Sequence, residues 1–546
     1  MPLQPQLSHC SFELIDQKIP KSFILKYLIL LSFFPMRFTL YGLLGFASLL
    51  HAAPIAENLS TTLKSLNVNP ADFSLWDQRN FLGNPRLTCV VLEKLFGSKS
   101  TGVYESGYTA LTEITWSQTC WLNPACIVSP ANAQDVSKAI IVLRALQTKF
   151  SIRSGGHMAN PGFSSAGPDA VLISLSNLTK LSLSSDKSIA TIGVGNRWGT
   201  VYNYLQPYNV TVVGGRIGTV GSALVLGGGL NYFSGQFGLS ADTVERFQVV
   251  LSNGSIVTAT RTKNSDLFQA LKGGSANFGI VTEFDLRTRY SGPLYYEAVL
   301  YPGDQYPALM KALVEYQRNG SLDTKASLVT SFRVEGNLVV FLYLDPVLRP
   351  SAFDPFYSLP SIPFFPPGFA TITELVAALG IGFSSEPERD ATRVTSFESD
   401  ESILNYSYGI WQQVIATLPA NASLEWVPQP IGASLKAKGD QYGGNILGLP
   451  AKNHIWLDIV AKWKNPADDA FILNATKFIL DKTDAFAKSK NKYLPYLFMN
   501  DAYADQKVLR SYGTTNFNKI VQVSKKYDPS QTFQKLQGNG YLWTRE

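Results

Sequence analysis

Residues 151–163, with the sequence SIRSGGHMANPGF, combine residue types that could hold a phosphate and attack a carbon. Glycines such as Gly155 and Gly156 allow backbone N–H groups to approach a phosphate closely and adopt positive φ at no steric cost. Arg153 precedes this pair, and His157, one of only four histidines in the chain, follows it. A neutral imidazole is a nucleophile. The same residues would also suit a turn in which the histidine only caps a strand, so the stretch alone leaves both interpretations open.

A second glycine-dense tract runs from Gly214 to Gly229 and continues to Gly235 and Gly238. It contains neither the G-x-x-x-x-G-K-[ST] phosphate loop nor the G-x-G-x-x-G dinucleotide fingerprint. A nucleoside triphosphate enzyme and a Rossmann dehydrogenase are therefore both disfavoured. Missing side chains permit either close approach to an extended ligand or a tight bend, and the two uses are compatible.

The elements around these stretches predict an α+β fold. Asn132, with Asp135 three residues later, is typical of a helix start, and apolar residues then recur at helical spacing up to Leu146. Asn253-Gly254 predicts a hairpin between two strands. Further strands are expected at 171–175, 189–194, 210–213, 244–251, 255–260 and 277–287, with a helix at 265–272.

From about Gly292 the pattern changes to a second domain, which we expect to be a sheet backed by helices. Strands are predicted at 295–300, 327–334 and 338–344, and helices at 371–379 and 467–485. We expect a Pro- and Phe-rich loop at 355–369, whose part from Phe356 to Phe369 would either line an apolar pocket or pack on the surface.

Composition limits the remaining function classes. The 546 residues are 45% hydrophobic and 16% charged, which is ordinary for a globular protein with a large core. The net charge of +6 is small for this size and forms no Lys/Arg stripe, so nucleic-acid binding is not expected.

Residues 1–53 resemble a leader. The run from Phe38 to Leu50, preceded by Met36 and Arg37 and followed by small residues, predicts a secretory signal whose true start is Met36. The competing interpretation is one membrane anchor across 23–50; each apolar run is shorter than the about 20 residues that a span needs. We expect a secreted protein without a stable membrane partner. Glycosylation sequons agree with secretion and occur at Asn58, Asn177, Asn209, Asn253, Asn319, Asn405, Asn421 and Asn474.

Three cysteines remain once Cys10 leaves with the leader. Parity predicts one disulfide and one free thiol in an oxidising compartment, and we expect the pair Cys89–Cys126 with Cys120 free. Their spacing is not that of a zinc site, so no metal is expected.

Taken together, the chain resembles the berberine bridge enzyme-like FAD-linked oxidoreductases of the vanillyl-alcohol oxidase superfamily, which have a PCMH-type FAD-binding domain. The resemblance covers nearly all of the mature chain. It is carried by six motifs in order: 124–130, 153–157, 214–229, 277–281, Asn500-Asp-Ala502 and Tyr527-Asp-Pro529.

The resemblance implies a two-subdomain FAD-binding domain followed by a substrate domain with an antiparallel sheet backed by helices. The expected segments are a leader (1–53), an N-terminal part of the FAD domain (54–121), the PCMH-type domain (122–292), the substrate domain (293–490) and a C-terminal segment returning to the FAD domain (491–546).

The resemblance also implies that FAD is bonded to His157 through the flavin 8-methyl carbon. Some members carry a second link through a cysteine at the position of Ile217, so a single bond is expected here. Val220 matches a position beside the flavin where a small side chain goes with access of oxygen. The residues expected near FAD are Arg153, Ser154, Gly155, Gly156, His157, Gly218, Thr219, Val220, Gly221, Gly228, Asn277, Phe278, Gly279, Ile280, Val281 and Asn500.

Members of this family pass a hydride to FAD while a base accepts a proton from the substrate. Many place a tyrosine directly after the asparagine that matches Asn500, but here Asp501 occupies that position. Asp501 would serve as the base if burial raises its pKa; a capping role is the alternative. Tyr503 and Tyr442 are the further catalytic candidates.

The predicted function is therefore a secreted FAD-dependent oxidase. It would act on a small organic substrate, preferably a secondary-metabolite intermediate, with O2 as the electron acceptor and H2O2 as the product. A carbohydrate oxidase is the alternative, and a flavin-loaded binding protein without turnover is the rival from another class.

Overall fold

The structure is a computed structural model that describes residues 59–69, 71, 82–380 and 387–546. The chain divides into two compact units, Met1–Thr61 and Thr62–Glu546. The second unit contains the three sheets. The predicted leader, the membrane-anchor alternative and the sequon at Asn58 lie outside the described residues. No helix within those residues combines the length and apolar character that crossing a membrane requires.

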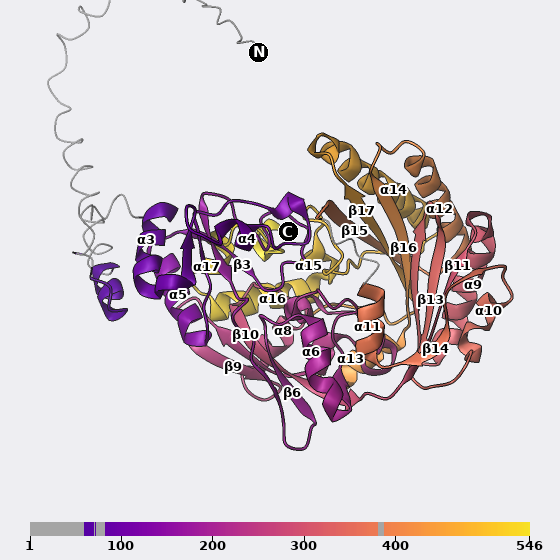
Figure 1. The fold of residues 1–546 in the computed structure, drawn as a ribbon, viewed down its shortest axis with the longest axis horizontal. Helices are drawn as coiled ribbons and strands as arrows, with labels where there is room; N and C mark the ends of the chain where they lie inside the picture. The colour runs from indigo at the N-terminus through magenta and orange to yellow at the C-terminus, as the bar shows by residue number, and fades with distance from the viewer. Residues whose placement is uncertain (1–58, 70, 72–81, 381–386) are drawn as a thin grey trace, which may run out of the picture. The chain divides into compact units, whose positions relative to one another are not determined.

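The first subdomain contains a four-stranded sheet (Figure 1). Its strands in spatial order are β1 (Ser100–Gly102), β2 (Cys126–Val128), β4 (Ala170–Ser174) and β3 (Lys149–Arg153). The accompanying helices are α3 (Pro85–Phe96), α4 (Tyr108–Thr112) and α5 (Ala133–Ala145). The Asn132 side chain caps α5 by accepting the N–H of Asp135 at 2.8 Å, as its sequence predicts. The disulfide joins Cys89 in α3 to Cys126 in β2, and Cys120 is a buried free thiol, so that prediction is confirmed.

The second subdomain contains a six-stranded sheet with β10 at its centre. Its strands are β5 (Leu181–Leu183), β6 (Ile189–Gly193), β7 (Val210–Val212), β8 (Val244–Val250), β9 (Ile256–Thr260) and β10 (Ile280–Tyr290). Its helices are α6 (Trp198–Leu205), α7 (Ser234–Phe237) and α8 (Ser265–Leu271). Gly254 turns the hairpin from β8 to β9 at φ +84°, which confirms the predicted turn.

The substrate domain is built on an eight-stranded antiparallel sheet. In spatial order the strands are β14 (Ile362–Ala370), β11 (Leu294–Tyr301), β13 (Gly336–Tyr343), β12 (Ala326–Arg333), β16 (Ser423–Ile431), β17 (His454–Trp463), β15 (Arg389–Glu398) and β18 (Tyr493–Leu494). The helices of this region are α9 (Tyr306–Arg318), α10 (Asp354–Tyr357), α11 (Ile372–Gly380), α12 (Glu401–Ile415), α13 (Ser434–Gln441) and α14 (Asp469–Ser489).

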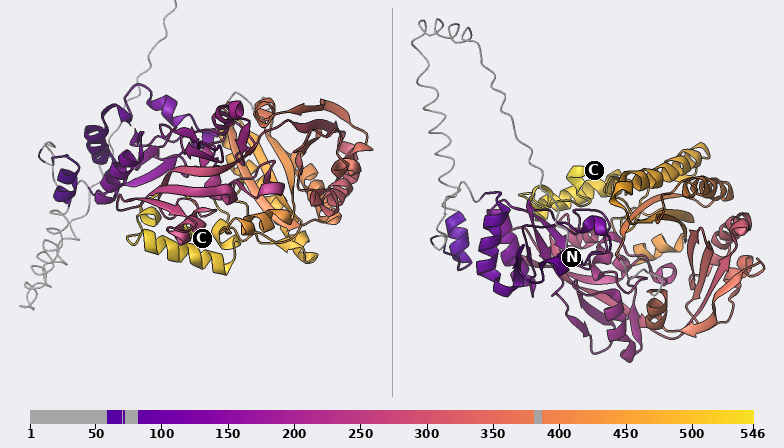
Figure 2. Two further views of the ribbon diagram at one scale, coloured as in Figure 1. Left: turned by 90° about the horizontal axis from the view of Figure 1, so that it is seen from below. Right: turned by 45° about the horizontal axis from the view of Figure 1, so that its top comes forward.

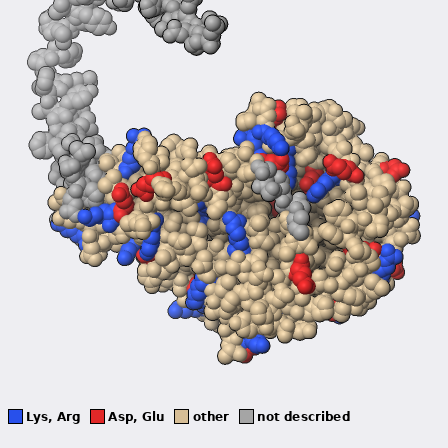
Figure 3. Space-filling model, viewed as in Figure 1, with Lys and Arg blue, Asp and Glu red and all other residues tan. Residues whose placement is uncertain are grey.

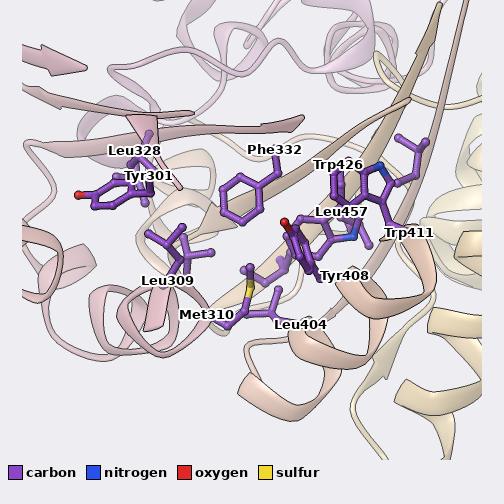
Figure 4. Packing of buried hydrophobic residues seen from close by; sticks show 14 of the residues in the cluster. Tyr301, Leu309, Met310, Leu328, Phe332, Leu404, Tyr408, Trp411, Trp426 and Leu457 are labelled. Atoms are coloured by element: carbon purple, nitrogen blue, oxygen red, sulfur yellow. The ribbon is translucent and has the colours of Figure 1, made fainter. Parts of the chain in front are cut away.

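The main core of the substrate domain lies between this sheet and helices α9, α12 and α14 (Figures 1 and 4). Tyr408 and Trp411 of α12 pack there against Phe332 and Trp426 of the sheet. Trp426 and Trp411 also satisfy their indole N–H groups, on Ser407 Oγ and the Leu424 carbonyl respectively, so the wide rings are buried without an unpaired donor. This dense packing gives the sheet a rigid back.

One expectation for this domain is wrong. Most of the predicted loop at 355–369 is strand β14, which pairs with β11 at the edge of the sheet. An edge position tolerates its prolines, because only one side of the strand pairs with a neighbour. Phe364 and Phe369 are 56% and 50% exposed, whereas Phe356 is fully buried among Phe341 and Phe353. These aromatics therefore do not line a common apolar pocket.

The C-terminal segment lies against the first domain (Figure 2). It contains α15 (Val508–Ser511), α16 (Thr514–Tyr527) and α17 (Thr532–Lys535). Asn277 binds it with its whole side-chain amide, which donates to the Tyr541 carbonyl at 2.8 Å and accepts from Gln534 and the Trp543 N–H. On the face shown in Figure 3, Lys and Arg side chains are interspersed with Asp and Glu side chains and form no continuous basic field.

Candidate active site

The two glycine stretches singled out in the sequence cross each other back to back. A Cβ on Gly155 would lie 2.4 Å from Gly221 Cα, and one on Gly221 would lie 2.5 Å from Gly155 N. Neither position has room for a side chain. Ser154 fixes the same turn by donating from Oγ to the Val194 carbonyl at 2.5 Å. Glycine at both positions is therefore required to bring the loop after β3 against the 218–221 tract.

His157 lies at this crossing. Its ring stacks on Trp116, with centroids 4.8 Å apart and planes inclined by 17°, and its Nε2 lies 3.4 Å from Thr219 Oγ1. The backbone N–H of Trp116 donates to the Gly156 carbonyl at 2.9 Å, and Gly156 adopts φ +73° to allow this turn. Burial and the positive charge of Arg197 lower the pKa of His157 to about 4. The imidazole is therefore neutral, and nucleophilic, at ordinary pH.

Two guanidinium groups accompany this loop without a carboxylate. Arg153 is 2% exposed, and its Nη1 has no hydrogen-bond partner within the described part of the chain. Burial and the charge of Arg197 lower the pKa of Arg153 to about 10. No acidic side chain among the described residues lies within 4.0 Å of either arginine. A buried orphaned cation next to a second cation fits a bound anion.

The turn after Phe498 ties the C-terminal segment to the glycine tract. Asn500 accepts the Gly229 N–H at 3.0 Å and donates to the Leu224 carbonyl at 3.2 Å. A Cβ on Gly227 would collide with the same amide at 2.5 Å. The side chain of Asn500 is therefore used in positioning the turn that presents Asp501.

The half-buried Asp501 and the buried Asp458 of β17 form a carboxylate pair whose charges interact. Burial raises the pKa of both groups, and the charge of Asp501 raises the pKa of Asp458 further. Gln429 of β16 donates from Nε2 to Asp501 Oδ2 at 2.9 Å and accepts at Oε1 from Arg216 Nη2 at 2.7 Å. A carboxylate whose pKa is raised is a stronger base, which suits this pair to accept a proton from a substrate.

The sheet presents further unpaired polar groups on the same face as Asp458. Strand geometry places alternate residues together, so Trp456 and Lys462 share the face of Asp458. The register puts Ser396 of β15 beside Trp456. Buried atoms with no hydrogen-bond partner among the described residues include Asp458 Oδ1, Trp456 Nε1, Ser396 Oγ and Tyr496 Oη. Such a concentration is typical of a ligand site, since buried polar atoms elsewhere are paired.

The same strand links this pair to the His157 loop. The charge of Lys462 contributes to lowering the pKa of His157. Lys462 is four residues beyond Asp458 on one face, a span of about 13 Å at the rise of a strand. In the first domain, Thr219 lies beside His157, and Arg216 is hydrogen-bonded to Gln429. Thr219 and Arg216 are three positions apart in the glycine tract. His157 and the carboxylate pair therefore lie at two ends of one interface between the domains.

The other predicted site residues have different surroundings. The guanidinium carbon of Arg393 lies 4.8 Å from the ring centroid of Tyr503. Arg393 also forms an ion pair with Asp505. Tyr442 lies at the end of β10, under Arg287 and hydrogen-bonded to Arg289 at 2.9 Å. Of the three catalytic candidates, only Asp501 shares hydrogen bonds with the Gln429 and Arg216 network among the described residues.

The predicted cofactor segment from Asn277 to Val281 forms the start of β10. The Asn277 side chain binds the C-terminal segment, and Phe278 is buried. Gly279 contacts Val249 and Val250, while Ile280 and Val281 pair with the same strand. Gly228, at φ +115°, packs against Phe498, whose ring stacks on Trp456 at 4.3 Å. The side chains of residues 277–281 pack within the first domain and against the C-terminal segment, which leaves their backbone groups for contact with a ligand.

Comparison with known proteins identifies the family. The model of an FAD binding domain matches residues 124–260. An FAD-dependent monooxygenase of Arthrobotrys oligospora is 98% identical over 511 residues, which is 94% of this chain and 100% of that protein. The FAD-dependent monooxygenase macF of Penicillium terrestre is 38% identical over 494 residues, covering 89% of this chain and 94% of its own length.

Solved structures share the fold at lower identity. The berberine bridge enzyme from Eschscholzia californica matches with a TM-score of 0.69 at 15% identity, over 83% of this chain and 98% of its own. The glucooligosaccharide oxidase from Acremonium strictum matches with a TM-score of 0.71 at 17% identity, over 84% of this chain and 100% of its own. The chain belongs to the FAD-dependent oxidoreductases, together with these FAD-dependent monooxygenases, and it has the fold of the berberine bridge enzyme. It is an enzyme that uses FAD.

The residues of this oxidoreductase fit FAD. The unpaired Nη1 of Arg153 and the neighbouring Arg197 would hold the negatively charged diphosphate. The touching glycines Gly155 and Gly221 leave backbone groups, without side chains, at the loop crossing. Thr219 is exposed there, beside His157.

Several residues of the site were not predicted. Trp116, Gln429, Asp458 and Lys462 carry no motif, and strand β17 was not expected at all. One signal was available: the run from His454 to Trp463 alternates core residues with His454, Trp456, Asp458 and Lys462, which is typical of a strand with one polar, functional face.

Proposed function

We propose that this oxidoreductase removes a hydride from a carbon that bears a hydroxyl group in a small organic metabolite. The observation that carries the proposal is the carboxylate pair of Asp458 and Asp501 at the domain interface. The ionised member accepts the hydroxyl proton, and Gln429 orients Asp501 through its amide. FAD, when bound, supplies the acceptor for the hydride.

We further propose that His157 holds FAD covalently. The neutral imidazole, stacked on Trp116, supports this role. Bond formation joins a ring nitrogen to the 8-methyl carbon; one hydrogen leaves each atom, and O2 takes up both with their two electrons as H2O2. The glucooligosaccharide oxidase with this fold is described as carrying a 6-S-cysteinyl, 8α-N1-histidyl FAD. Ile217 at the position of the second link supports a single bond here.

An acid-denatured gel tests the link. Flavin fluorescence should stay with the wild-type protein band and leave it in His157→Ala, whereas Trp116→Phe, which keeps a stacking ring, should retain it. Fluorescence that leaves the wild-type band, or persists in His157→Ala, contradicts the assignment.

Anaerobic mixing with a panel of hydroxylated metabolites and oligosaccharides tests the reaction. Bleaching of the yellow colour by a metabolite is expected, with recovery and one H2O2 per turnover when O2 is admitted. The buried aromatic stack of Trp456, Phe498 and Tyr496 favours a flat organic substrate over a sugar. Bleaching by oligosaccharides alone would replace the substrate class, and no bleaching by any substrate would overturn the reaction.

A monooxygenase is the second candidate, because the two relatives described above carry that name. Mass spectrometry of the product formed under ¹⁸O2 separates the two reactions. An oxidase leaves the label in peroxide, whereas a monooxygenase transfers one labelled atom to the product.

Secretion completes the proposal. Sequons at Asn177, Asn209, Asn253, Asn319, Asn421 and Asn474 lie at exposed positions, which supports passage through a glycosylating compartment. Recovery of the protein from culture medium with a mobility that endoglycosidase shifts is the expected result. Retention in the cells without glycans would exclude it.

A further inference from the structure

A cleft between the two domains opens beside the carboxylate pair. Side chains from both domains line it, and its lining is more polar than apolar. The apolar part includes Leu230, Leu328 and Leu435. Arg216 and Gln429 line it as well, and they also belong to the hydrogen-bonded network of Asp501. The cleft therefore connects solvent with the candidate base through these two side chains.

Two prolines explain why the sheet leaves space here. Strand β16 pairs with β17 along its whole length, but with β12 at only one position, Phe332 opposite Trp426. Beyond that pair, Pro428 and Pro430 have no N–H to donate to a neighbouring strand. The ladder between β12 and β16 stops, and the cleft includes Gln429, Pro430 and Leu328 at that point. The proline on either side of Gln429 thus opens the sheet where this amide is presented.

The charge of Arg216 is not neutralised by direct contact. No carboxylate among the described residues lies within 4.0 Å of its guanidinium group, and the hydrogen bond described for that group is to the neutral amide of Gln429. A guanidinium offers five N–H donors in a planar fork that matches a carboxylate. The residue is half-buried and lines the cleft, so its guanidinium group can be reached from there.

We infer that Arg216 is a specificity-determining residue that binds a negatively charged oxygen of the substrate. The substrate class is an organic anion with an apolar body, whose charge is a carboxylate or a phenolate. Leu230, Leu328 and Leu435 contact the body, and Gln429 places the anionic group within two side chains of Asp501. This inference rests on the proposed function, because it assumes that the cleft delivers a substrate to the carboxylate pair.

Two pairs of probes test the inference on the flavin-loaded, full-length enzyme. Benzoate and 4-cyanophenolate supply a carboxylate and a phenolate, whereas benzamide and 4-methoxybenzonitrile are neutral compounds of similar shape. Binding is followed through the change in flavin absorbance. In the wild type at least one anion should bind about 10 to 100 times more tightly than its neutral counterpart, as a charged hydrogen bond predicts.

Variants assign this preference to the side chain. Arg216→Gln should reduce the ratio to near one, and Arg216→Lys should keep part of it. Arg318→Gln is the matched control, because Arg318 is 69% exposed on α9 and should not change the ratio. Retained flavin and an unchanged melting temperature show that each variant is folded. Arg216→Lys is the decisive variant if Arg216→Gln loses flavin.

The outcomes separate this inference from the proposed function. Equal binding of anions and neutral compounds by the wild type, or an unchanged ratio in Arg216→Gln, overturns the inference. If a neutral metabolite still bleaches the flavin in that case, the proposed reaction stands without it. Preference for only one anion supports the inference and decides between carboxylate and phenolate.

Discussion

The two faces of strand β17 consist of alternate residues of one ten-residue segment, yet they have opposite properties. The face toward helices α12 and α14 carries Ile455, Leu457, Ile459, Ala461 and Trp463, all within the main core. The other face carries His454, Trp456, Asp458, Val460 and Lys462, and its buried Trp456 Nε1 and Asp458 Oδ1 have no hydrogen-bond partner among the described residues. The first face packs the core, whereas the second holds these two polar atoms at the candidate site.

This contrast shows how one strand can serve stability and chemistry without compromise. Burying unpaired polar atoms costs free energy, and a strand can bear the cost because its opposite face is packed to core density. Substitutions on the two faces should therefore separate activity from stability.

The largest effect is expected for Asp501→Asn, which removes the candidate base. The variant should lose about 10²- to 10⁴-fold in kcat/KM, because proton transfer contributes that much to catalysis. Its stability at pH 7 should not fall, since the amide replaces a carboxyl group whose pKa burial raises. Stopped-flow reduction of the flavin measures the effect. Asp505→Asn, in the same turn but paired with Arg393, is the control and should keep its activity.

A change on the core face should have the opposite signature. Leu457→Ala removes a fully buried side chain and should lower the free energy of unfolding by about 2–5 kcal/mol. The rate of flavin reduction in the folded fraction should stay within a few fold of the wild type. Urea unfolding measures the free energy of unfolding, and single-turnover kinetics measures the rate of flavin reduction. Val460→Ala, at a half-buried position on the other face of β17, is the comparison. A large loss of rate at unchanged stability would show that the two faces are not separate.

The pH dependence of stability tests a further buried carboxyl group, Asp390 of β15, which pairs with Lys462 of β17. Burial raises the pKa of Asp390 to about 7, above its ordinary value near 4. The folded state then holds the proton over this interval, so wild-type stability falls as pH rises from 4 to 7. Asp390→Asn should be more stable than the wild type at pH 7, by at most about 4 kcal/mol, and equal to it below pH 4.

Asp400 supplies a matched comparison of opposite sign. Although burial opposes it, the hydrogen bonds of Lys492 and Ser402 hold the pKa of Asp400 at about 2. Its contribution to stability is present above pH 4 and is lost as pH falls through 2. Asp400→Asn should therefore be less stable than the wild type at pH 7. Equal pH profiles for both variants in chemical denaturation would contradict these assignments.

Local signals in the sequence predicted much of the first domain. The Asn132 cap and the Asn253-Gly254 turn depend on residues close together in sequence. The crossing of the two glycine stretches was not predicted, because it joins segments far apart in the chain. The substrate domain was harder. Residues 362–370 contain three prolines, which argue against a strand, but the free edge beside β11 accepts them.

The prediction of the site shows the same difference between local and non-local signals. His157 and Asp501 stand next to motifs and could be named, whereas Asp458 and Gln429 become meaningful only when β16, β17 and the C-terminal turn lie together. No local sequence pattern indicates that Asp501 raises the pKa of Asp458 on β17, because the two residues are far apart in sequence. Tyr503 was named for its place beside Asp501, but its ring lies on Arg393 instead.

The Asn277 clasp has a consequence for biosynthesis. Asn277 is held by Tyr541 and Gln534, residues translated 264 and 257 positions later. During synthesis on the ribosome, β10 and Asn277 emerge long before Gln534 and Tyr541, which hydrogen-bond the Asn277 side chain. The hydrogen bonds of Asn277 in the first domain are therefore completed only after the C-terminal segment has been synthesised.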